Sequence, residues 1–226
     1  DSGFLPDEIK LYPCALVSGT QLVQKYREGA WQPYTKDELV DVLVQDVLAT
    51  PPYVRISRMI RDISATDILV GNKHTNLRQM VEQELAAKDV ASRVQEIRFR
   101  EINQQQVSAA ELTLQDFVYT TAVSDEHFLQ WVTADNKIAG FCRLSLPHWD
   151  KLISGACDVT ANELLVQPGQ AMIRELHVYG QALSLGSEGM SAQHQGLGQK
   201  LLAKASSIAA EAGYTSLNVI SSIGTR

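Results

Sequence analysis

Gln193-His194-Gln195-Gly196-Leu197-Gly198 is the stretch of this sequence that decides its fold. The residues that follow, 199–212, carry apolar side chains at helical spacing, and Gly213 then ends the pattern. Glycines at a helix start let backbone N–H groups approach a phosphate, and the helix dipole favours that negative charge. The stretch therefore predicts a helix whose N-terminus binds a phosphate-bearing cofactor, although a Gly-x-Gly at a helix start is more often only a tight turn.

The segments around this helix predict a sheet that is mainly antiparallel. Four strands are expected before the helix and one after it, at 114–121, 127–133, 137–146, 172–179 and 215–220. Residues 134–136 read as a hairpin turn between two of these strands. The glycine-rich loop 180–191 reads as a surface connection between the fourth strand and the helix.

The first hundred residues alternate strand-like and helix-like segments, an order typical of parallel sheets. Strands are expected at 11–17, 53–60 and 94–102. One helix is expected to begin at a capping box formed by Thr35 and Glu38 and to end before Pro51-Pro52. A second helix is expected at 77–88. The polar stretch 104–106 then suggests a domain boundary, which gives domains at 1–103 and 104–226.

Composition excludes several classes of protein. The chain has 226 residues, 45% of them hydrophobic, which is enough for a substantial core. Its net charge of −6 gives no chain-wide basic character, and Cys14, Cys142 and Cys157 are too far apart in sequence for a disulfide scaffold or a Cys-only zinc site. Without an apolar run that could span a membrane, and without a signal pattern, the chain is expected to be cytoplasmic. Its start at Asp1 suggests a piece of a longer protein.

The order of these elements resembles the GNAT acetyltransferase fold. It runs from an antiparallel meander through a further strand to a Gln-x-x-Gly-x-Gly turn, a helix and a last strand. In that fold the turn holds the pyrophosphate of acetyl-CoA, and the preceding strand pairs with the pantetheine arm. The match is closer still to one family, because 175–180, 192–198 and 219–226 resemble the acetyltransferase half of the Elongator catalytic subunit.

The N-terminal half is similar to the same family. Residues 10–13, 34–40, 51–56 and 61–63 match, in order and spacing, the later part of its radical-SAM domain. The resemblance implies an α/β chain in which the C-terminal portion of a radical-SAM partial (βα) barrel precedes a GNAT-like domain.

The family implies a reaction. A 4Fe-4S cluster reduces S-adenosylmethionine to a radical, acetyl-CoA supplies the acetyl group, and the wobble uridine of tRNA gains a 5-carboxymethyl group. Three distant cysteines cannot hold such a cluster, so its ligands are expected outside this sequence. Val94, Glu96 and Phe99 stand where zinc-binding relatives carry cysteines, so no zinc is predicted. The implied RNA partner is the anticodon region of tRNA. The resemblance also implies a homodimer or a larger Elongator-like complex.

The resemblance also names cofactor-binding residues, while no catalytic residue and no metal ligand is assigned. The residues expected at acetyl-CoA are Glu175, Leu176, His177, Val178, Gln193, Gly196, Leu197, Gly198 and Gln199. The loop 180–191 is hypothesised to cover this site as a lid.

A local excess of basic residues is consistent with tRNA binding. Between residues 55 and 100 there are nine basic and six acidic residues, so this window is +3 while the rest of the chain is −9. Such an excess is often only a solvated face, but the resemblance favours contacts with RNA phosphates. The expected tRNA-binding residues are Arg55, Arg58, Arg61, Lys73, Arg78, Arg93, Arg98 and Arg100.

Two other functions stay open. The chain fits a plain GNAT enzyme that acetylates a protein lysine or a small amine, or a scaffold that binds tRNA and acetyl-CoA without catalysis.

Aromatic side chains stack on RNA bases, but near apolar runs they usually belong to the hydrophobic core. Tyr12, Trp31, Tyr34 and Tyr53 are therefore expected in the core.

Overall fold

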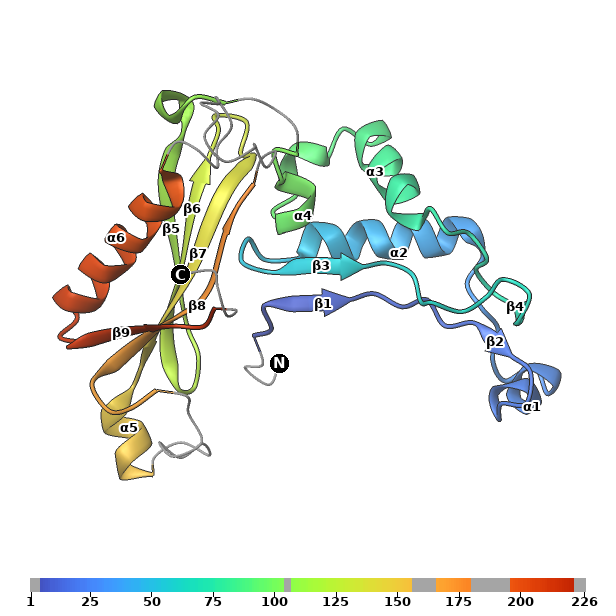
Figure 1. Ribbon diagram of the computed structural model, residues 1–226. Helices are drawn as coiled ribbons and strands as arrows, with labels where there is room; N and C mark the ends of the chain where they lie inside the picture. Colours follow the sequence, from blue (N-terminus) through green and yellow to red (C-terminus); the bar gives the residue numbers. More distant parts are fainter. Residues whose placement is uncertain (1–4, 104–106, 156–165, 180–195, 222–226) are drawn as a thin grey trace. The chain divides into compact units, whose positions relative to one another are not determined.

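A computed structural model describes residues 5–103, 107–155, 166–179 and 196–221, and Figure 1 shows its helices and strands. The chain divides into two compact units, one of residues 6–99 and one of residues 100–226 together with 1–5. Among the helices of the described residues, none is long and apolar enough to cross a membrane.

The N-terminal unit, residues 6–99, packs helices against short strands. In chain order its elements are β1 (Glu8–Lys10), β2 (Leu16–Val17), α1 (Leu22–Arg27), α2 (Lys36–Ala49), β3 (Arg55–Arg58), β4 (Ile68–Val70), α3 (Leu77–Ala87), η1 (Ala91–Arg93) and the start of α4 (Ile97–Arg100). β1 pairs with β3 in parallel, and β2 pairs with β4 antiparallel. The core lies between α2, α3 and β3 and includes Leu43, Val44, Ile56, Val81 and Leu85.

The predicted capping box is present at the start of α2. The Thr35 hydroxyl accepts a hydrogen bond from the backbone N–H of Glu38 at 3.3 Å, and the Glu38 carboxylate accepts one from the N–H of Thr35 at 2.8 Å. The helix ends at Ala49, directly before Thr50 and Pro51. Both predicted ends of this helix are therefore confirmed.

Two predicted strands in this unit are wrong. Residues 94–102 form no strand; they contain α4, whose start is held by the side chain of Glu96. Within 11–17 only β2 is strand, and the parallel partner of β3 is β1 instead. Pro13 explains the second error, because proline lacks the N–H that a ladder needs.

The C-terminal unit contains a five-stranded sheet in the order β5-β6-β7-β8-β9. Its strands are β5 (Thr113–Thr120), β6 (Ser124–Val132), β7 (Ile138–Pro147), β8 (Gln170–Val178) and β9 (Ser216–Val219). The first four are antiparallel neighbours, and β8 pairs with β9 in parallel. Each lies within a few residues of a predicted strand, and Asn136, with φ of +64°, forms the predicted hairpin turn.

One long helix, α6 (Leu197–Glu211), follows the sheet along one face (Figure 1). Its apolar side packs on β6, β7 and β8, with Leu201, Ala205 and Ala209 buried against Leu144 and Ile173. Gly213, with φ of +88°, follows the helix as predicted. Two short helices, η2 (Ala109–Glu111) and α5 (Trp149–Ser154), complete the unit.

Candidate functional site

A bulge in β8 determines which of its side chains face α6. The pairing with β7 shifts so that Leu144 lies opposite Ile173 while Arg143 lies opposite Glu175, which leaves Arg174 as the extra residue. Directly paired residues share a face of the sheet, so Ile173 and Leu176 both lie on the α6 face although they are three residues apart. The bulge therefore turns Leu176 and Val178 towards the helix, and Glu175 and His177 away from it.

The N-terminus of α6 packs against this end of β8. Gly196 precedes the helix with φ of +67°, and no side chain of the described residues caps it. A Cβ atom on Gly198 would lie 3.6 Å from Cγ2 of Val178 and 4.0 Å from Cδ2 of Leu176. The first N–H groups of α6, which have no acceptor within the helix, thus lie beside an apolar patch on β8.

β9 pairs with only the first part of β8. The β8–β9 ladder joins Gln170–Ile173 to Ser216–Val219, whereas the ladder between β8 and β7 continues to Val178. Because β9 ends at Val219, the part of β8 that α6 approaches, 175–178, is paired with β7 but not with β9. An extended ligand could be received along this unpaired edge of β8.

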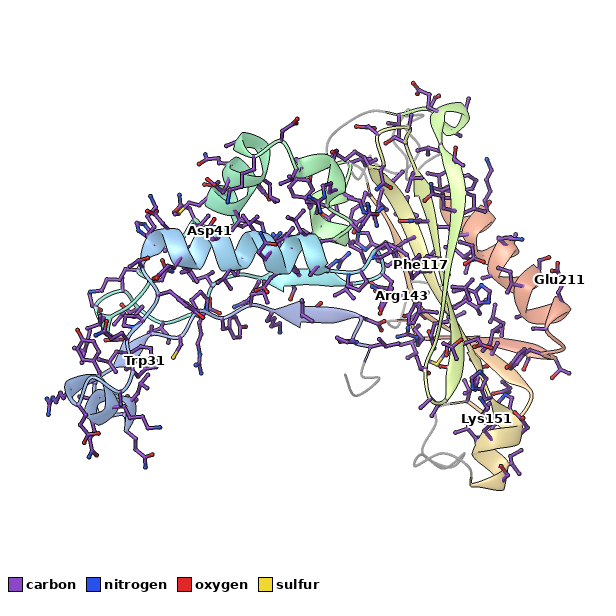
Figure 2. The ribbon with its side chains drawn as sticks, turned by 180° about the vertical axis from the view of Figure 1, so that it is seen from behind. Trp31, Asp41, Phe117, Arg143, Lys151 and Glu211 are labelled. Carbon is purple, nitrogen blue, oxygen red and sulfur yellow. The ribbon has the colours of Figure 1, made fainter. Side chains whose placement is uncertain are left out.

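The opposite face of β8 holds charged and aromatic side chains. The Glu175 carboxylate accepts a hydrogen bond from Nε of Arg143 at 2.9 Å. Arg143, labelled in Figure 2, places its guanidinium 5.1 Å from the ring centre of Phe128 and 5.4 Å from that of Phe141. The ring of His177 stacks on Phe141, with centres 6.0 Å apart. Glu175 and His177 therefore support the sheet from the face opposite α6.

A buried carboxylate that the sequence analysis missed holds the bulge. Glu126, only 4% exposed, accepts hydrogen bonds from Nε of Arg174 at 2.9 Å and from its Nη2 at 2.7 Å. The hydroxyls of Ser124 and Ser145 donate to its other oxygen at 2.6 and 2.5 Å. No motif marks these residues, because the cluster joins three strands; only alternation along β6 could have placed Glu126 on the same face as its partners.

The predicted cofactor residues are partly brought together. Leu176, Val178, Leu197 and Gly198 meet at the junction of β8 and α6, and Oε1 of Gln199 lies 3.8 Å from the position a Cβ on Gly196 would take. Gln193 and the predicted lid at 180–191 lie outside the described residues. The junction combines helix N–H groups, absent Cβ atoms and apolar side chains, a set that could hold a phosphate group joined to an apolar arm.

An iron–sulfur cluster does not fit the described residues. Cys142 is fully buried in β7, and burial raises the pKa of its thiol to about 12. Cys14 belongs to the other unit. In the part of the chain that the structure describes, no three His, Cys, Asp or Glu side chains are grouped to hold a metal ion.

The predicted tRNA-binding residues differ in how much charge they present. Five are exposed, namely Arg58, Arg61, Lys73, Arg93 and Arg98. Arg55 and Arg78 are half-buried, and the Arg78 guanidinium donates to the carbonyl of Ile56.

Arg100 requires a correction. It is 2% exposed, and its Nη1 donates to the side-chain oxygens of Gln130 at 3.1 Å and Asn136 at 3.0 Å. A guanidinium held in this way cannot also contact RNA phosphates. We therefore leave Arg100 out of the tRNA surface proposed below.

The prediction for the aromatic residues is also partly wrong. Tyr53 is buried, but Tyr12 is 43% exposed and Tyr34 is 63% exposed. Trp31, labelled in Figure 2 near the end of the N-terminal unit, is half-buried. Tyr12 precedes Pro13, Trp31 follows a turn and Tyr34 follows Pro33, so none of the three belongs to a helical or alternating pattern that would predict burial.

Comparison with known proteins gives one family match. The Radical_SAM C-terminal domain matches residues 6–87, which lie within the N-terminal unit.

Relatives match the whole chain. A "tRNA uridine(34) acetyltransferase" from Dehalococcoides mccartyi (strain CBDB1) is 38% identical over 231 residues, covering 100% of this chain and 48% of that protein. "Elongator complex protein 3" from Homo sapiens is 31% identical and covers 99% of this chain and 40% of that protein. The chain thus spans less than half the length of these relatives.

A solved structure confirms the fold. The archaeal Methanocaldococcus infernus Elp3 with an N-terminal deletion matches with a TM-score of 0.78 and 29% identity, over 96% of this chain and 50% of that one. The predicted fold class, a mixed α/β chain with the C-terminal portion of a radical-SAM domain, is therefore correct.

Proposed function

Since the chain is related over its full length to the Elongator catalytic-subunit family, we propose that it is part of a tRNA wobble-uridine-modifying enzyme. In this proposal the C-terminal unit binds acetyl-CoA and the N-terminal unit supplies part of the tRNA surface. The product is 5-carboxymethyluridine, formed with a radical from S-adenosylmethionine. None of the described residues is assigned to that radical chemistry.

The observation that carries the proposal is the approach of α6 to the end of β8. The N–H groups at Leu197, Gly198 and Gln199 would hold the pyrophosphate, because they open the helix and no Cβ on Gly198 obstructs the ligand. Leu176 and Val178 would pack against the pantetheine arm where β8 continues beyond its ladder with β9. When bound, acetyl-CoA supplies an acetyl group activated as a thioester.

The exposed cations of the N-terminal unit support the tRNA part of the proposal. Arg58, Arg61, Lys73, Arg93 and Arg98 offer charge to the RNA backbone, which carries most affinity that does not depend on sequence. Arg98 is held in place, because its Nη1 donates to the carbonyl of Ser57 at 2.7 Å.

The experiment is acetyl-CoA hydrolysis by the full-length protein, measured as release of free CoA thiol with and without tRNA. We expect tRNA with a wobble uridine to raise the rate, and a tRNA of equal length without that uridine to raise it less. Efficient acetylation of a lysine peptide in the absence of tRNA, with no response to tRNA, would overturn the proposal in favour of a plain acetyltransferase.

A further inference from the structure

The N-terminal unit contains an aromatic hollow that the acetyl-CoA site does not use. Its volume is about 580 Å³, and Tyr12, Trp31 and Tyr34 line it over a floor formed by Leu39 and Leu43 of α2. This volume is in the range of sites for small ligands and exceeds what one side chain would fill.

The rings of this hollow are accessible and partly braced. Tyr12 and Tyr34 are exposed, so their rings are accessible to a ligand. Trp31 is packed edge-on by Tyr26, with ring centres 6.4 Å apart and planes at 64°. A planar ligand would therefore meet one fixed indole and two accessible phenol rings.

Polar groups stand at the edge of the same hollow. Asp46, Gln32 and Lys10 line it together with the aromatic rings. Asn72 lines it too, and its side chain is fixed by hydrogen bonds with the backbone N–H and carbonyl of His74 at 3.2 and 3.1 Å. Aromatic faces combined with hydrogen-bonding groups are the features that bind a nucleobase.

A smaller basic hollow adjoins the aromatic one. The two share Pro13 and Asn72 as lining residues, and the second has a volume of about 40 Å³. Arg61 and Lys73 line it, both exposed, and no acidic residue does. A phosphate attached to a base in the first hollow would therefore meet two cations next to it.

We propose that the aromatic hollow binds one unpaired base of an RNA, with a neighbouring phosphate of the RNA backbone at Arg61 and Lys73. This inference deepens the proposed function and rests on it, because the RNA in question is the tRNA substrate. A base in a duplex cannot enter, since both of its faces are stacked and its polar edge is paired. The site therefore selects single-stranded loops.

The test uses the full-length protein and a labelled RNA stem-loop with an unpaired loop of the anticodon type. Replacing Tyr34 or Tyr12 by leucine removes a stacking face and should weaken binding by about fivefold to a hundredfold, the range for one base–aromatic contact. Tyr34→Phe keeps the ring and should restore most of the affinity. Phe117→Leu, which changes a 39%-exposed aromatic residue in the other unit, is the matched control and should bind as the parent does.

A second measurement, tryptophan fluorescence, reports on the hollow directly. A base stacked near Trp31 should quench its fluorescence, and the quenching should disappear in Trp31→Phe although Trp131 and Trp149 remain. The fully paired duplex should neither quench nor respond to Tyr34→Leu. Free uridine monophosphate, ATP and CoA serve as competitors, because they carry the same base-and-phosphate chemistry without an RNA loop.

The outcomes separate this inference from the proposed function. If the parent protein binds the stem-loop and both leucine variants bind it equally well, the inference fails while the tRNA proposal stands. If a free nucleotide quenches Trp31 and the stem-loop does not, the hollow is a small-nucleotide site and the inference fails. If the parent protein binds no tRNA at all, the proposed function fails, and this inference fails with it.

Discussion

The carboxylate of Glu96 accepts a hydrogen bond from the backbone N–H of Ile56, 40 residues earlier in the chain, at 2.6 Å. The same carboxylate accepts the N–H groups of Arg98 at 3.0 Å and Phe99 at 2.8 Å, which open α4. It is completely buried, with Arg78 at 3.9 Å. Glu96 thus joins the edge of β3 to the start of α4 through three backbone donors that would otherwise be unsatisfied.

Glu96→Gln should therefore destabilise the N-terminal unit. The glutamine NH₂ group would face at least one backbone N–H that now donates to a carboxylate oxygen, and leaving a buried donor unpaired costs about 1–3 kcal/mol. The measurement is the free energy of unfolding in urea. Glu84→Gln, at a half-buried residue whose side chain pairs with Lys88 at the surface, is the control and should change stability by less than about 0.5 kcal/mol.

The effect of Glu96 should also depend on pH in a definite direction. Burial raises the pKa of Glu96 above its ordinary value of 4.5, and the three N–H donors and Arg78 oppose this without cancelling it. The folded state then holds the proton more tightly than the unfolded state, so stability falls as pH rises through the raised pKa. The advantage of the parent protein over Glu96→Gln should be fully present below pH 4.5, the ordinary pKa, and smaller at neutral pH. An advantage that grows with pH would contradict this assignment.

Elements with a strong local signal were predictable from the sequence. The Thr35 capping box, the turn before Lys137 and the apolar stripe of α6 each depend on residues close together in the chain, and each was predicted within a few residues. Residues 94–102 show the limit, because alternation there resembles a strand. The carboxylate of Glu96 and the distant N–H of Ile56 instead stabilise a helix start, and no local pattern contains that contact.

The candidate site was predictable to the same extent. Gly196 and Gly198 mark the helix start in the sequence itself, and α6 begins there as predicted. The bulge at Arg174 was not, because it depends on the pairing of β7 with β8 and on the distant Glu126. Without the bulge, strict alternation would place Ile173 and Leu176 on opposite faces.

Gly140→Ala should disturb the end of β8. A Cβ on Gly140 would lie 2.9 Å from the carbonyl oxygen of His177 and 3.3 Å from Cα of Val178, which are backbone atoms that must shift. Overpacking of this kind typically costs about 1–3 kcal/mol. We expect a lower melting temperature and weaker acetyl-CoA binding together, measured by thermal unfolding and titration calorimetry. A variant with unchanged stability and affinity would show that β7 and β8 tolerate the methyl group.

Gly198→Ala should separate stability from binding. The added Cβ would make only ordinary contacts with Val178 and Leu176, at 3.6 and 4.0 Å, and alanine favours a helix over glycine by up to about 1 kcal/mol. The folded protein should thus be as stable as the parent or more so. Its acetyl-CoA affinity should fall by roughly tenfold to a hundredfold, because the methyl group would prevent a charge-assisted N–H contact worth about 1.5–3 kcal/mol.

The matched control for Gly198→Ala is Ser206→Ala, an exposed position further along α6. Both changes favour the helix, but Ser206 lies two turns beyond the junction with β8, so acetyl-CoA should bind Ser206→Ala as it binds the parent. Equal affinity in all three proteins would mean that the N-terminus of α6 is not where the cofactor binds.

Arg174→Met should show whether the buried network holds the bulge. Among the described residues, the change leaves the Glu126 carboxylate with the hydroxyls of Ser124 and Ser145 as its donors. Removing one partner of a fully buried pair costs about 3–5 kcal/mol. Because the side chain of Arg174 is 27% exposed, we expect a loss below that range, about 2–3 kcal/mol.

The double variant Glu126→Gln with Arg174→Met makes this prediction specific. It removes the buried charge together with its partner, so it should be more stable than Arg174→Met alone, with a coupling of about 0.5–3 kcal/mol between the two positions. Because the bulge turns Leu176 and Val178 towards α6, acetyl-CoA affinity should fall in Arg174→Met. Urea unfolding of the four proteins in the cycle, with calorimetry of acetyl-CoA binding, measures both quantities. Additive losses of stability would show that Glu126 and Arg174 do not act as a pair, and the bulge would then need another cause.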